Sequence, residues 1–524
     1  MELFPIAVPQ SKDASFPLYV RLRKGEITRN LSFRAGTVLS FDTYFNAFSC
    51  SKYLRYTSVR SAWAEIVVSG SFSIELCFRR AGGGETIAAT SETAAGFSGP
   101  VKIPFDFSGA EENSICYLRL RAKEDGCRFL EGRYAADTEP HPVRMAIVTC
   151  TYRRERYILA NVEKLRRALL EAPAGPVRDL LEIFVVDNGG TLGGRLPDDR
   201  RIHLVKNKDC SGFTRGMIEL LRKQDEFTHI LLMDDDIKVE PASVFKMIQF
   251  LSVAKLEYRE LFVAGGMLLL DRPIIQYEAT ARWDGYEHPL KAQLDLSKVE
   301  SLFENEKEEK ADYGGWWCLC IPLCIVSDTN LPLPFFFRND DIEYGLRNMK
   351  QCLVLNGIGV WHQAFNAKFS TIHYYYIIRN QMVVNAIYGL TEPAGAFLWR
   401  LLKLTLKAIA YGHPEVVDYL EMAVNHYLAG VDFFLSTDGE HLHSELMGRG
   451  PHPEVLAKRS AWERLTALVP KLFSAELREA IPRYCRIAAG YLKKHRRAEE
   501  DYQLRWKELT CLGFWEKQLD LADR

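Results

Sequence analysis

Segments of strand length and helix length alternate along the middle of this chain, between residues 144 and 268. The apolar runs expected to form strands are residues 144–150, 181–186, 201–205, 228–233 and 261–268. Helices are expected over 155–170 and 212–222, and another starts at Pro241, where a missing N–H is tolerated. This alternation predicts an α/β fold with a mainly parallel sheet, which binds its ligands at the carboxyl ends of the strands.

The flanking parts of the chain have different patterns. Before about residue 140, apolar side chains alternate with mostly polar ones over 72–78 and 101–107. Short strands with turns between them predict an N-terminal β-sandwich. From about residue 391 the pattern is helical to the end. We therefore expect a β-sandwich domain over 1–142, an α/β domain over 143–390 and a helical domain over 391–524.

Composition narrows the class of protein. The 524 residues are 47% hydrophobic and 26% charged, as in a globular protein with ample core, and a net charge of −1 argues against a nucleic-acid partner. The 12 cysteines lack paired zinc-finger spacing, and Cys318, Cys320 and Cys324 are interpreted as buried small residues. Residues 1–24 lack a signal-peptide pattern, and no apolar stretch reaches the ~20 residues of a membrane span. We expect a cytoplasmic protein with reduced thiols.

Two acidic clusters lie about a hundred residues apart. Asp234-Asp235-Asp236 directly follows an apolar run, and Asp340-Asp341 is followed by Glu343 and, further on, by His362. An Asp-x-Asp at the end of a buried strand provides the oxygen ligands that Mg²⁺ or Mn²⁺ prefers when it bridges a nucleotide diphosphate. A later carboxylate can deprotonate an attacking hydroxyl. Although acidic triplets also serve as helix caps or solvated loops, the two clusters together indicate a sugar-nucleotide-dependent glycosyltransferase.

Two further segments leave alternatives open. The aromatic stretch over 40–48 fits either a buried core or a surface that stacks on sugar rings. Arg400, Lys403 and Lys407 recur at helical spacing on an apolar helix, and a basic run occupies 493–497. These basic residues fit either attachment to an anionic membrane surface, on the inner face of the cytoplasmic membrane, or a solvated helix face.

Nine motifs occur in a characteristic order over roughly residues 40–385. They are TYFNAF (43–48), TCTYRR (149–154), DNGG (187–190), SGFTRGM (211–217), MDDDI (233–237), YGGWW (313–317), NDDIEYG (339–345), VWH (360–362) and HYYYIIRN (373–380). The chain resembles the GT-A fold of glycosyltransferase family 2 and, more closely, the bacterial galactofuranosyltransferases that build cell-wall galactan. The loop 208–210 departs from the family, which is richer in glycine there.

The resemblance implies a set of donor-binding residues. Asp187 corresponds to the residue that contacts uracil, and Arg154 or its neighbour Arg153 to the arginine suited to the diphosphate. Asp235 is expected toward the donor sugar. The remaining donor-binding residues are Thr149, Asn207, Ser211 and His373. Asn207 and Ser211 precede a helix N-terminus, which favours anionic groups, and His373 is expected to reach the donor phosphate.

The resemblance also implies the metal, catalytic and acceptor residues. The metal ligands are Asp234, Asp236 and His362, for Mn²⁺ or Mg²⁺. Asp341 matches the catalytic base, with Asp340 expected to orient the acceptor or the base and Glu343 to form hydrogen bonds with acceptor or donor hydroxyls. Gly315, Trp316 and Trp317 match the acceptor signature, in which aromatic faces pack on sugars. If two of the acidic carboxylates lie close together, the pKa of one should rise.

The preferred interpretation is an inverting transferase that moves galactofuranose from UDP-galactofuranose to a glycan or lipid-linked glycan acceptor, and the resemblance favours a homo-oligomer. A second interpretation keeps the fold and metal but uses another donor, such as UDP-galactopyranose, UDP-glucose or a rhamnosyl nucleotide. A third is a carbohydrate-binding protein without catalysis. Metal-dependent phosphoryl transfer is disfavoured, because the chain has no G-x₄-G-K-[ST] loop.

Overall fold

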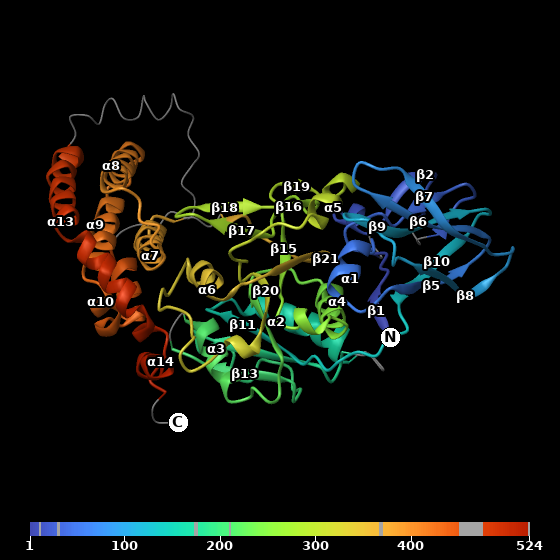
Figure 1. Ribbon diagram of the computed structural model, residues 1–524, viewed down its shortest axis with the longest axis horizontal. Helices are drawn as coiled ribbons and strands as arrows, with labels where there is room; N and C mark the ends of the chain where they lie inside the picture. The colour runs from blue at the N-terminus through green and yellow to red at the C-terminus, as the bar shows by residue number, and fades with distance from the viewer. Residues whose placement is uncertain are drawn as a thin grey trace.

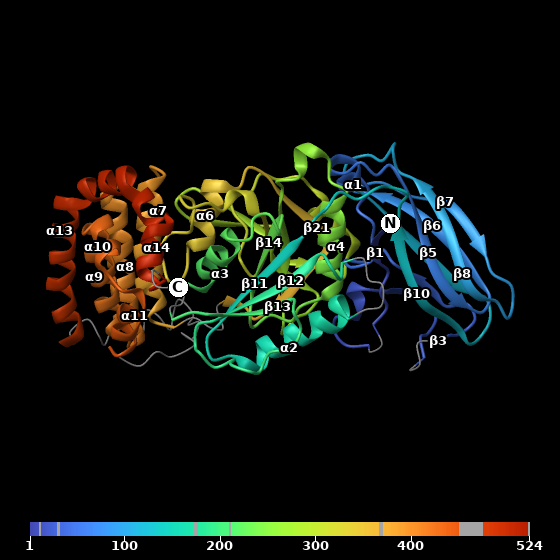
Figure 2. The same cartoon turned by 90° about the horizontal axis from the view of Figure 1, so that it is seen from below.

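The computed structural model describes residues 1–9, 12–28, 32–171, 177–208, 211–365, 370–449 and 475–521. Figures 1 and 2 show three parts in a row along the long axis of the molecule. Two antiparallel sheets from the N-terminal part lie at one end, a large mixed sheet with its helices lies in the middle, and a bundle of C-terminal helices lies at the other end.

The central sheet has nine strands in the order β13-β12-β11-β14-β20-β15-β16-β19, with β21 paired to β15. Their bounds are β11 Met145–Thr151, β12 Leu181–Asp187, β13 Ile202–Lys206, β14 His229–Asp234, β15 Phe262–Leu269, β16 Ile275–Glu278, β19 Leu294–Asp295, β20 Cys318–Pro322 and β21 Cys352–His362. The five strands predicted in this region are all present, each end within one residue of its predicted position.

The sheet is mixed, so the expectation of a mainly parallel sheet is confirmed only in part. Strands β11 to β14 pair in parallel, and so do β15 and β21. However, β20 inserts antiparallel between β14 and β15, and β16 and β19 continue antiparallel beyond them. β20 is antiparallel to β14 on one side and to β15 on the other, so β14 and β15 run in the same direction. β21 is parallel to β15 and runs in that direction too. Their carboxyl ends therefore lie at the same edge of the sheet.

Helices cover both faces of this sheet. Helices α2 Glu155–Leu165 and α4 Pro241–Ser252 share one core with Met145 and Ile147 of β11, whereas α3 Gly212–Leu221 shares the other core with Ala146 and Val148. Successive side chains of a strand point to opposite faces, so a strand buried on both faces has a continuous apolar run. This explains why these strands could be predicted from apolar runs in the sequence.

The N-terminal part consists of two five-stranded antiparallel sheets with a shared core. One contains β1 Glu2–Pro5, β10 Cys127–Ala135, β5 Ser61–Ser69, β8 Ser98–Asp106 and β3 Ser32–Phe33. The other contains β2 Arg21–Lys24, β4 Val38–Ser40, β9 Ser114–Ala122, β6 Phe72–Arg80 and β7 Glu85–Glu92. In β5, every second side chain from Ala62 to Val68 is buried, as expected for a strand with one face on a core.

The aromatic stretch over 40–48 is core. Tyr44 and Phe48 are at most 1% exposed, and the Tyr44 hydroxyl donates to the carbonyl of Ile358 in β21 over 2.7 Å. Just beyond it, Ser49 Oγ donates over 2.6 Å to the buried carboxylate of Glu306, the last residue of α5 Val299–Glu306. The stretch thus joins the N-terminal sheets to the central sheet, and the alternative of a sugar-stacking surface is set aside.

The C-terminal part is helical, as predicted. Its helices are α7 His373–Ile387, α8 Ala394–Tyr411, α9 Glu415–Leu428, α10 Val431–Ser436, α11 Gly439–Met447, α13 Ala475–Arg505 and α14 Leu512–Gln518. They share a core with one face of the central sheet. Among the described residues, none of the helices combines the length and the apolar character that crossing a membrane requires.

Candidate active site

Three predicted metal ligands meet at the carboxyl edge of the central sheet. Asp234 ends β14, Asp236 lies in the turn that follows, and His362 ends β21. The Nε2 of His362 lies 3.1 Å from Oδ1 of Asp236 and 3.6 Å from Oδ2 of Asp234, and one ligand atom from each residue lies within 4.8 Å of the others. Two carboxylates and an imidazole at this spacing can hold a divalent cation.

The second nitrogen of His362 supports this assignment. Nδ1 lies 2.6 Å from the carbonyl oxygen of Gln363, which can only accept a hydrogen bond, so Nδ1 carries the proton. In a neutral ring Nε2 then points a lone pair at the two carboxylates. A cation stabilises lone pairs that point at one another in this way. A metal-binding histidine usually donates the N–H of its non-ligating nitrogen to a carbonyl or carboxylate, as Nδ1 does here.

Arg154 lies against the same acidic turn. Its Nη1 is 3.2 Å from Oδ1 of Asp235 and 2.8 Å from Oδ2 of Asp236. Burial raises the pKa of Asp235 to about 6, and Arg154 opposes that rise. The neighbouring Arg153 is exposed and stacks on Tyr152, with its guanidinium 5.2 Å from the ring centroid. Of the two arginines, Arg154 is the one beside the metal residues.

The second acidic cluster opens α6 Asp340–Asn348. Burial raises the pKa of both Asp340 and Asp341, and the charges of Asp340 and Glu287 raise that of Asp341 further. The backbone N–H of Ile342 donates to Asp341 Oδ1 over 2.9 Å, which fixes the carboxylate at the helix start. Asp341 is thus held in place with a raised pKa, as a general base requires.

Glu343 lies apart from this pair. Its side chain is fully buried and forms an ion pair of 2.7 Å with Arg347, one helical turn later. The Tyr388 hydroxyl donates to its other oxygen over 3.1 Å. Since both carboxylate oxygens have protein partners, Glu343 fastens α6 to its surroundings, and we leave it out of the proposed catalytic set.

The predicted donor loops follow β11, β12 and β13. Asp187 is 2% exposed and accepts from the N–H groups of Gly189 and Leu192 over 3.1 and 2.8 Å, so it shapes its own loop. Asn207 Nδ2 donates to Asn188 Oδ1 over 3.0 Å, and Ser211 is the N-cap residue of α3. Thr149 is 2% exposed within β11 and faces the protein interior rather than the loops. Asp209 and Cys210 lie outside the described residues.

The two tryptophans of the acceptor signature are largely buried. Trp316 and Trp317 are 5% and 6% exposed, and the Trp317 indole donates to the carbonyl of Gly265 over 3.0 Å. A Cβ at Gly315 would lie 1.9 Å from the Trp317 ring, so glycine is required there by the packing of that ring. The Trp317 ring in turn contacts Phe365, whose centroid is 5.8 Å away.

His373 begins α7 near the loop that leads to Asp341. Its ring packs edge-on against Phe337, with centroids 5.1 Å apart, and its Nδ1 lies 2.9 Å from Ser370 Oγ. Burial, reinforced by the charge of Arg338, lowers the pKa of His373 to about 4. A neutral imidazole beside this loop can offer a hydrogen bond to a phosphate but not a positive charge.

Two residues of the site escaped the sequence interpretation. Glu278, at the end of β16, is 2% exposed, and its Oε2 has no hydrogen-bond partner within the described parts of the chain. Burial, together with the charges of Glu287 and Asp341, raises the pKa of Glu278 to about 8. Arg338, just before α6, faces the same acids. No local pattern marks either residue: Glu278 is placed by the pairing of β15 with β16, and Arg338 by a loop whose carbonyls α7 holds.

The raised pKa of Glu278 predicts a pH-dependent stability. The folded state keeps its proton up to about pH 8 whereas the unfolded state loses it near pH 4.5, so stability falls as pH rises between these values. Glu278→Gln removes this loss. We expect the variant to melt at a higher temperature than wild type at pH 8.5 and at a similar temperature at pH 4. Thermal unfolding across this range tests it, with the exposed Glu112→Gln as control, and a difference independent of pH contradicts it.

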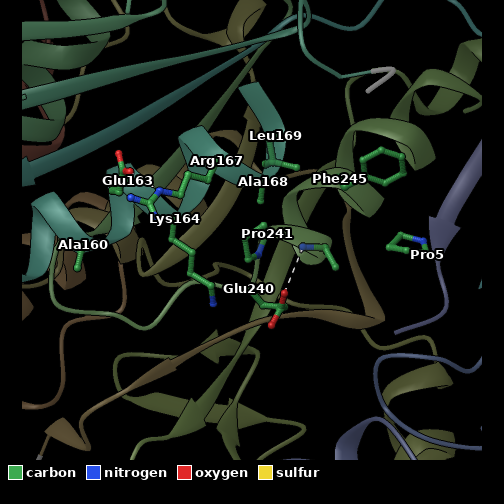
Figure 3. Close-up of a pocket in the computed structure, with 11 residues that line it drawn as sticks. Pro5, Ala160, Glu163, Lys164, Arg167, Ala168, Leu169, Glu240, Pro241 and Phe245 are labelled. Atoms are coloured by element: carbon green, nitrogen blue, oxygen red, sulfur yellow. Dashed lines mark hydrogen bonds and ion pairs between the residues drawn. The ribbon is translucent and has the colours of Figure 1, made fainter. Parts of the chain in front are cut away.

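A hollow of about 730 Å³ lies elsewhere on the protein, between α2, the N-terminus of α4 and β1 (Figure 3). It shares no residue with the acidic clusters. Its charged groups already have partners: Lys164 donates to the carbonyl of Val239 over 2.6 Å, and Glu240 accepts from the Tyr19 hydroxyl over 2.7 Å. We assign it no part in the site.

Comparison with known proteins identifies similar sequences along most of the chain. The chain is similar to galactofuranosyltransferase GlfT2 of Mycolicibacterium smegmatis, with 26% identity over 477 residues, 85% of this chain and 71% of that protein. It is also similar to GlfT2 of Mycobacterium tuberculosis, with 28% identity over 449 residues, 78% of this chain and 68% of that protein. The family described as galactofuranosyltransferase 2 N-terminal matches residues 21–137.

Among solved structures, one of GalNAc-T7 with UDP, GalNAc and Mn²⁺ aligns with 49% of each chain at 9% identity and a TM-score of 0.34, too low to establish a shared fold. The sequence matches are the informative comparisons, and they define the chain as a glycosyltransferase. More particularly, it is a galactofuranosyltransferase-like glycosyltransferase.

Proposed function

We propose that this chain is an inverting, metal-dependent glycosyltransferase that moves galactofuranose from UDP-galactofuranose to a glycan or lipid-linked glycan acceptor. The observation that carries the proposal is that Arg338, three residues before Asp341, connects the base-bearing helix to the candidate metal triad: its guanidinium stacks on Phe365, 5.1 Å from the ring centroid, and that centroid is 5.5 Å from the ring centroid of His362. The names of the two similar proteins support galactofuranose as the transferred sugar.

In this proposal residues 143–390 form a GT-A catalytic domain, flanked by a β-sandwich over 1–142 and a helical domain over 391–524. Support comes from the strand ends: Asp187, Asp234 and His362 are each the last residue of a strand of the central sheet. Nucleotide ligands bind at the carboxyl ends of such strands. The base helix α6 lies in the connection between β20 and β21, and the loop before it reaches the metal residues: the Arg338 guanidinium stacks on Phe365, whose ring centroid is 5.5 Å from that of His362.

Asp234, Asp236 and His362 would hold Mn²⁺ or Mg²⁺, whose charge stabilises the departing UDP. Arg154, already beside these residues, would contact the diphosphate, and Asp235 the donor sugar. Asp187, Asn207 and Ser211 are proposed to line the nucleotide, and His373 to donate a hydrogen bond to a phosphate.

The proposed reaction is a single displacement. Asp341 takes the proton from an acceptor hydroxyl, and the oxygen forms a bond to the anomeric carbon of the donor. The bond from that carbon to the diphosphate breaks, its electron pair leaves with UDP, and the anomeric configuration inverts. The raised pKa of Asp341 supports this role, because a base works best near the operating pH. Asp340 would orient the acceptor, and the edges of Trp316 and Trp317 would contact its sugar.

We also propose that the enzyme contacts a membrane surface and forms an oligomer. Lys403 and Lys407 are exposed on α8, beside Trp399, which is 57% exposed, so this face has the composition of a peripheral contact with an anionic membrane. Arg400 is instead paired with Glu392 over 2.5 Å. A homo-oligomer remains our expectation from the family resemblance.

The donor assignment is tested by UDP release with Mn²⁺ and a glycan acceptor. UDP-galactofuranose is expected to turn over at least about tenfold faster than UDP-galactopyranose or UDP-glucose, since one group misplaced in a shaped pocket costs about 1 to 3 kcal/mol. Faster turnover of a pyranose donor would replace the donor assignment but keep the site. If none of the three donors binds in calorimetry, the glycosyltransferase proposal itself is contradicted.

A further inference from the structure

The loop before α6 has an unusual backbone. Phe336, Arg338 and Asn339 have φ angles of 67°, 68° and 67°, all in the left-handed region. Residues other than glycine rarely adopt this conformation, and it persists only where the surrounding structure enforces it. Such residues cluster at functional sites, and here they directly precede the proposed base.

Two side chains of α7 hold this loop. Arg379 Nη2 donates to the carbonyl of Phe335 over 2.9 Å, and Asn380 Nδ2 donates to the carbonyls of Phe337 and Arg338 over 2.9 and 2.8 Å. Arg379 is 2% exposed and Asn380 is fully buried. These hydrogen bonds fix the loop carbonyls and hence the direction in which the Arg338 side chain leaves the backbone.

The Arg338 guanidinium lies between the two acidic clusters. It stacks on Phe365, 5.1 Å from the ring centroid, and the centroid of Phe365 is 5.5 Å from that of the metal-site residue His362. The charges of Asp341, Glu287, Asp234 and Asp340 all act on it, in decreasing order. Arg338 is therefore one aromatic ring away from the metal triad and next to the base.

Arg338 differs from Arg154 in that its guanidinium forms no ion pair among the described residues. Arg154 forms ion pairs with Asp235 and Asp236. Within the described residues, by contrast, none of the ion pairs or side-chain hydrogen bonds involves the Arg338 guanidinium, and its Nε is buried without a partner. A half-buried arginine near four carboxylates that pairs with none of them is suited to a ligand that brings its own negative charge and oxygen acceptors.

We propose that Arg338 binds the diphosphate of the donor nucleotide and stabilises it as the leaving group. This inference rests on the proposed function. As the bond between the anomeric carbon and the diphosphate oxygen breaks, the electron pair moves onto that oxygen, and negative charge grows there while Asp341 takes the acceptor proton. A fixed guanidinium interacts more strongly with the growing charge than with the intact donor, so it accelerates the reaction as well as binding UDP.

A lipid-linked acceptor can carry a diphosphate too, so the test must separate the two sources. Binding of UDP, UMP and uridine is measured by calorimetry on the full-length protein with Mn²⁺, for wild type, Arg338→Gln and Arg338→Lys. The control is Arg55→Gln, an exposed arginine that also stacks on an aromatic ring, at 5.5 Å from the Tyr56 centroid. Circular dichroism and melting temperature check that each variant is folded.

Arg338→Gln is expected to weaken UDP binding about tenfold or more, the effect of one lost charge-assisted hydrogen bond, while uridine binding stays within about twofold. The kcat for UDP-galactofuranose should fall as well, and Arg338→Lys should recover part of both losses. If Arg338→Gln does not fold, Arg338→Lys alone decides: its UDP affinity must be measurably below wild type, because an ammonium cannot form two parallel hydrogen bonds.

Unchanged UDP affinity in folded variants overturns the inference. So does a rise of KM confined to a diphosphate-bearing acceptor, which assigns Arg338 to the acceptor. A wild-type protein that binds no UDP contradicts the proposed function instead, and it is distinguished because the wild-type measurement comes first.

Discussion

Asp341→Asn is expected to lower kcat by about 100- to 10,000-fold, the usual contribution of a general base, while UDP affinity stays within about twofold of wild type. The amide keeps the size of the carboxylate and can still accept from the Ile342 N–H, but it cannot take a proton. The loss should therefore appear in the chemical step. Single-turnover kinetics with UDP-galactofuranose and calorimetry with UDP measure the two quantities separately.

The control for this prediction is Asp106→Asn, an exposed aspartate that accepts from the Ser108 N–H in the N-terminal part of the chain. It should retain wild-type kinetics. An Asp341→Asn variant within about tenfold of wild-type kcat excludes Asp341 as the base. Asp340→Asn tested beside it then shows whether the neighbouring carboxylate takes the proton.

Asp236→Ala is expected to remove most metal-dependent activity. Loss of a group that only supports a metal ligand typically costs about 10- to 100-fold in metal affinity or activity, so loss of a ligand should exceed that. In the wild type, a chelator should abolish turnover and added Mn²⁺ or Mg²⁺ should restore it. In the variant, Mn²⁺ binding followed by electron paramagnetic resonance should weaken in parallel with activity.

A second effect of Asp236→Ala has to be separated from the first. The substitution also removes the 2.8 Å ion pair with Arg154, so the donor diphosphate contact could change as well. Arg154→Gln distinguishes the two: it should weaken UDP binding but leave Mn²⁺ binding within about twofold, because Arg154 is not a ligand. The exposed Asp225→Ala is the matched control. Full activity of Asp236→Ala in the presence of chelator contradicts the metal assignment.

Much of the fold could be predicted because the strands of the central sheet are buried on both faces. The apolar runs at 144–150, 181–186 and 228–233 predicted strands that differ by at most one residue at either end from those observed, so the polar residues after them could be placed at one edge. The insertion of β20 could not be predicted. Its five residues, Cys318–Pro322, follow the tryptophan motif, and nothing in so short a run indicates its antiparallel neighbours.

The residues of the candidate site that could be predicted are those that lie in recognisable sequence motifs. His362 is 126 residues from Asp236 along the chain, and they are brought together by the pairing of β15 with β21 and by the bridge between Lys238 and Trp361. The sequence nevertheless indicated His362, because Val360 and Trp361 of the motif precede it. Glu278 and Arg338 had no such marker. Glu278 gains its significance from burial beside Asp341, and Arg338 from a left-handed loop that α7 holds in place. Both properties depend on tertiary structure.

The packing of two motifs shows what the sequence left open or did not indicate. In the aromatic stretch over 40–48, the Tyr44 hydroxyl donates a hydrogen bond to the carbonyl of Ile358 in the interior. The stretch therefore connects the N-terminal sheets to the central sheet. The HYYYIIRN motif was expected to supply His373 to the donor. That role stays a prediction, and the last two residues of the motif, Arg379 and Asn380, also form the hydrogen bonds that hold the loop before α6.

The central claim is that one site, with Asp341 as base, inverts a furanose donor. The measurement that tests it most directly is the anomeric configuration of the product, determined by NMR after transfer from UDP-galactofuranose to a synthetic glycan acceptor in the presence of Mn²⁺. The account predicts a galactofuranosyl product whose configuration is opposite to that of the donor, and no product from Asp341→Asn on the same timescale. A product that retains the donor configuration would contradict a single displacement with Asp341 as the base, because such a displacement inverts the anomeric centre.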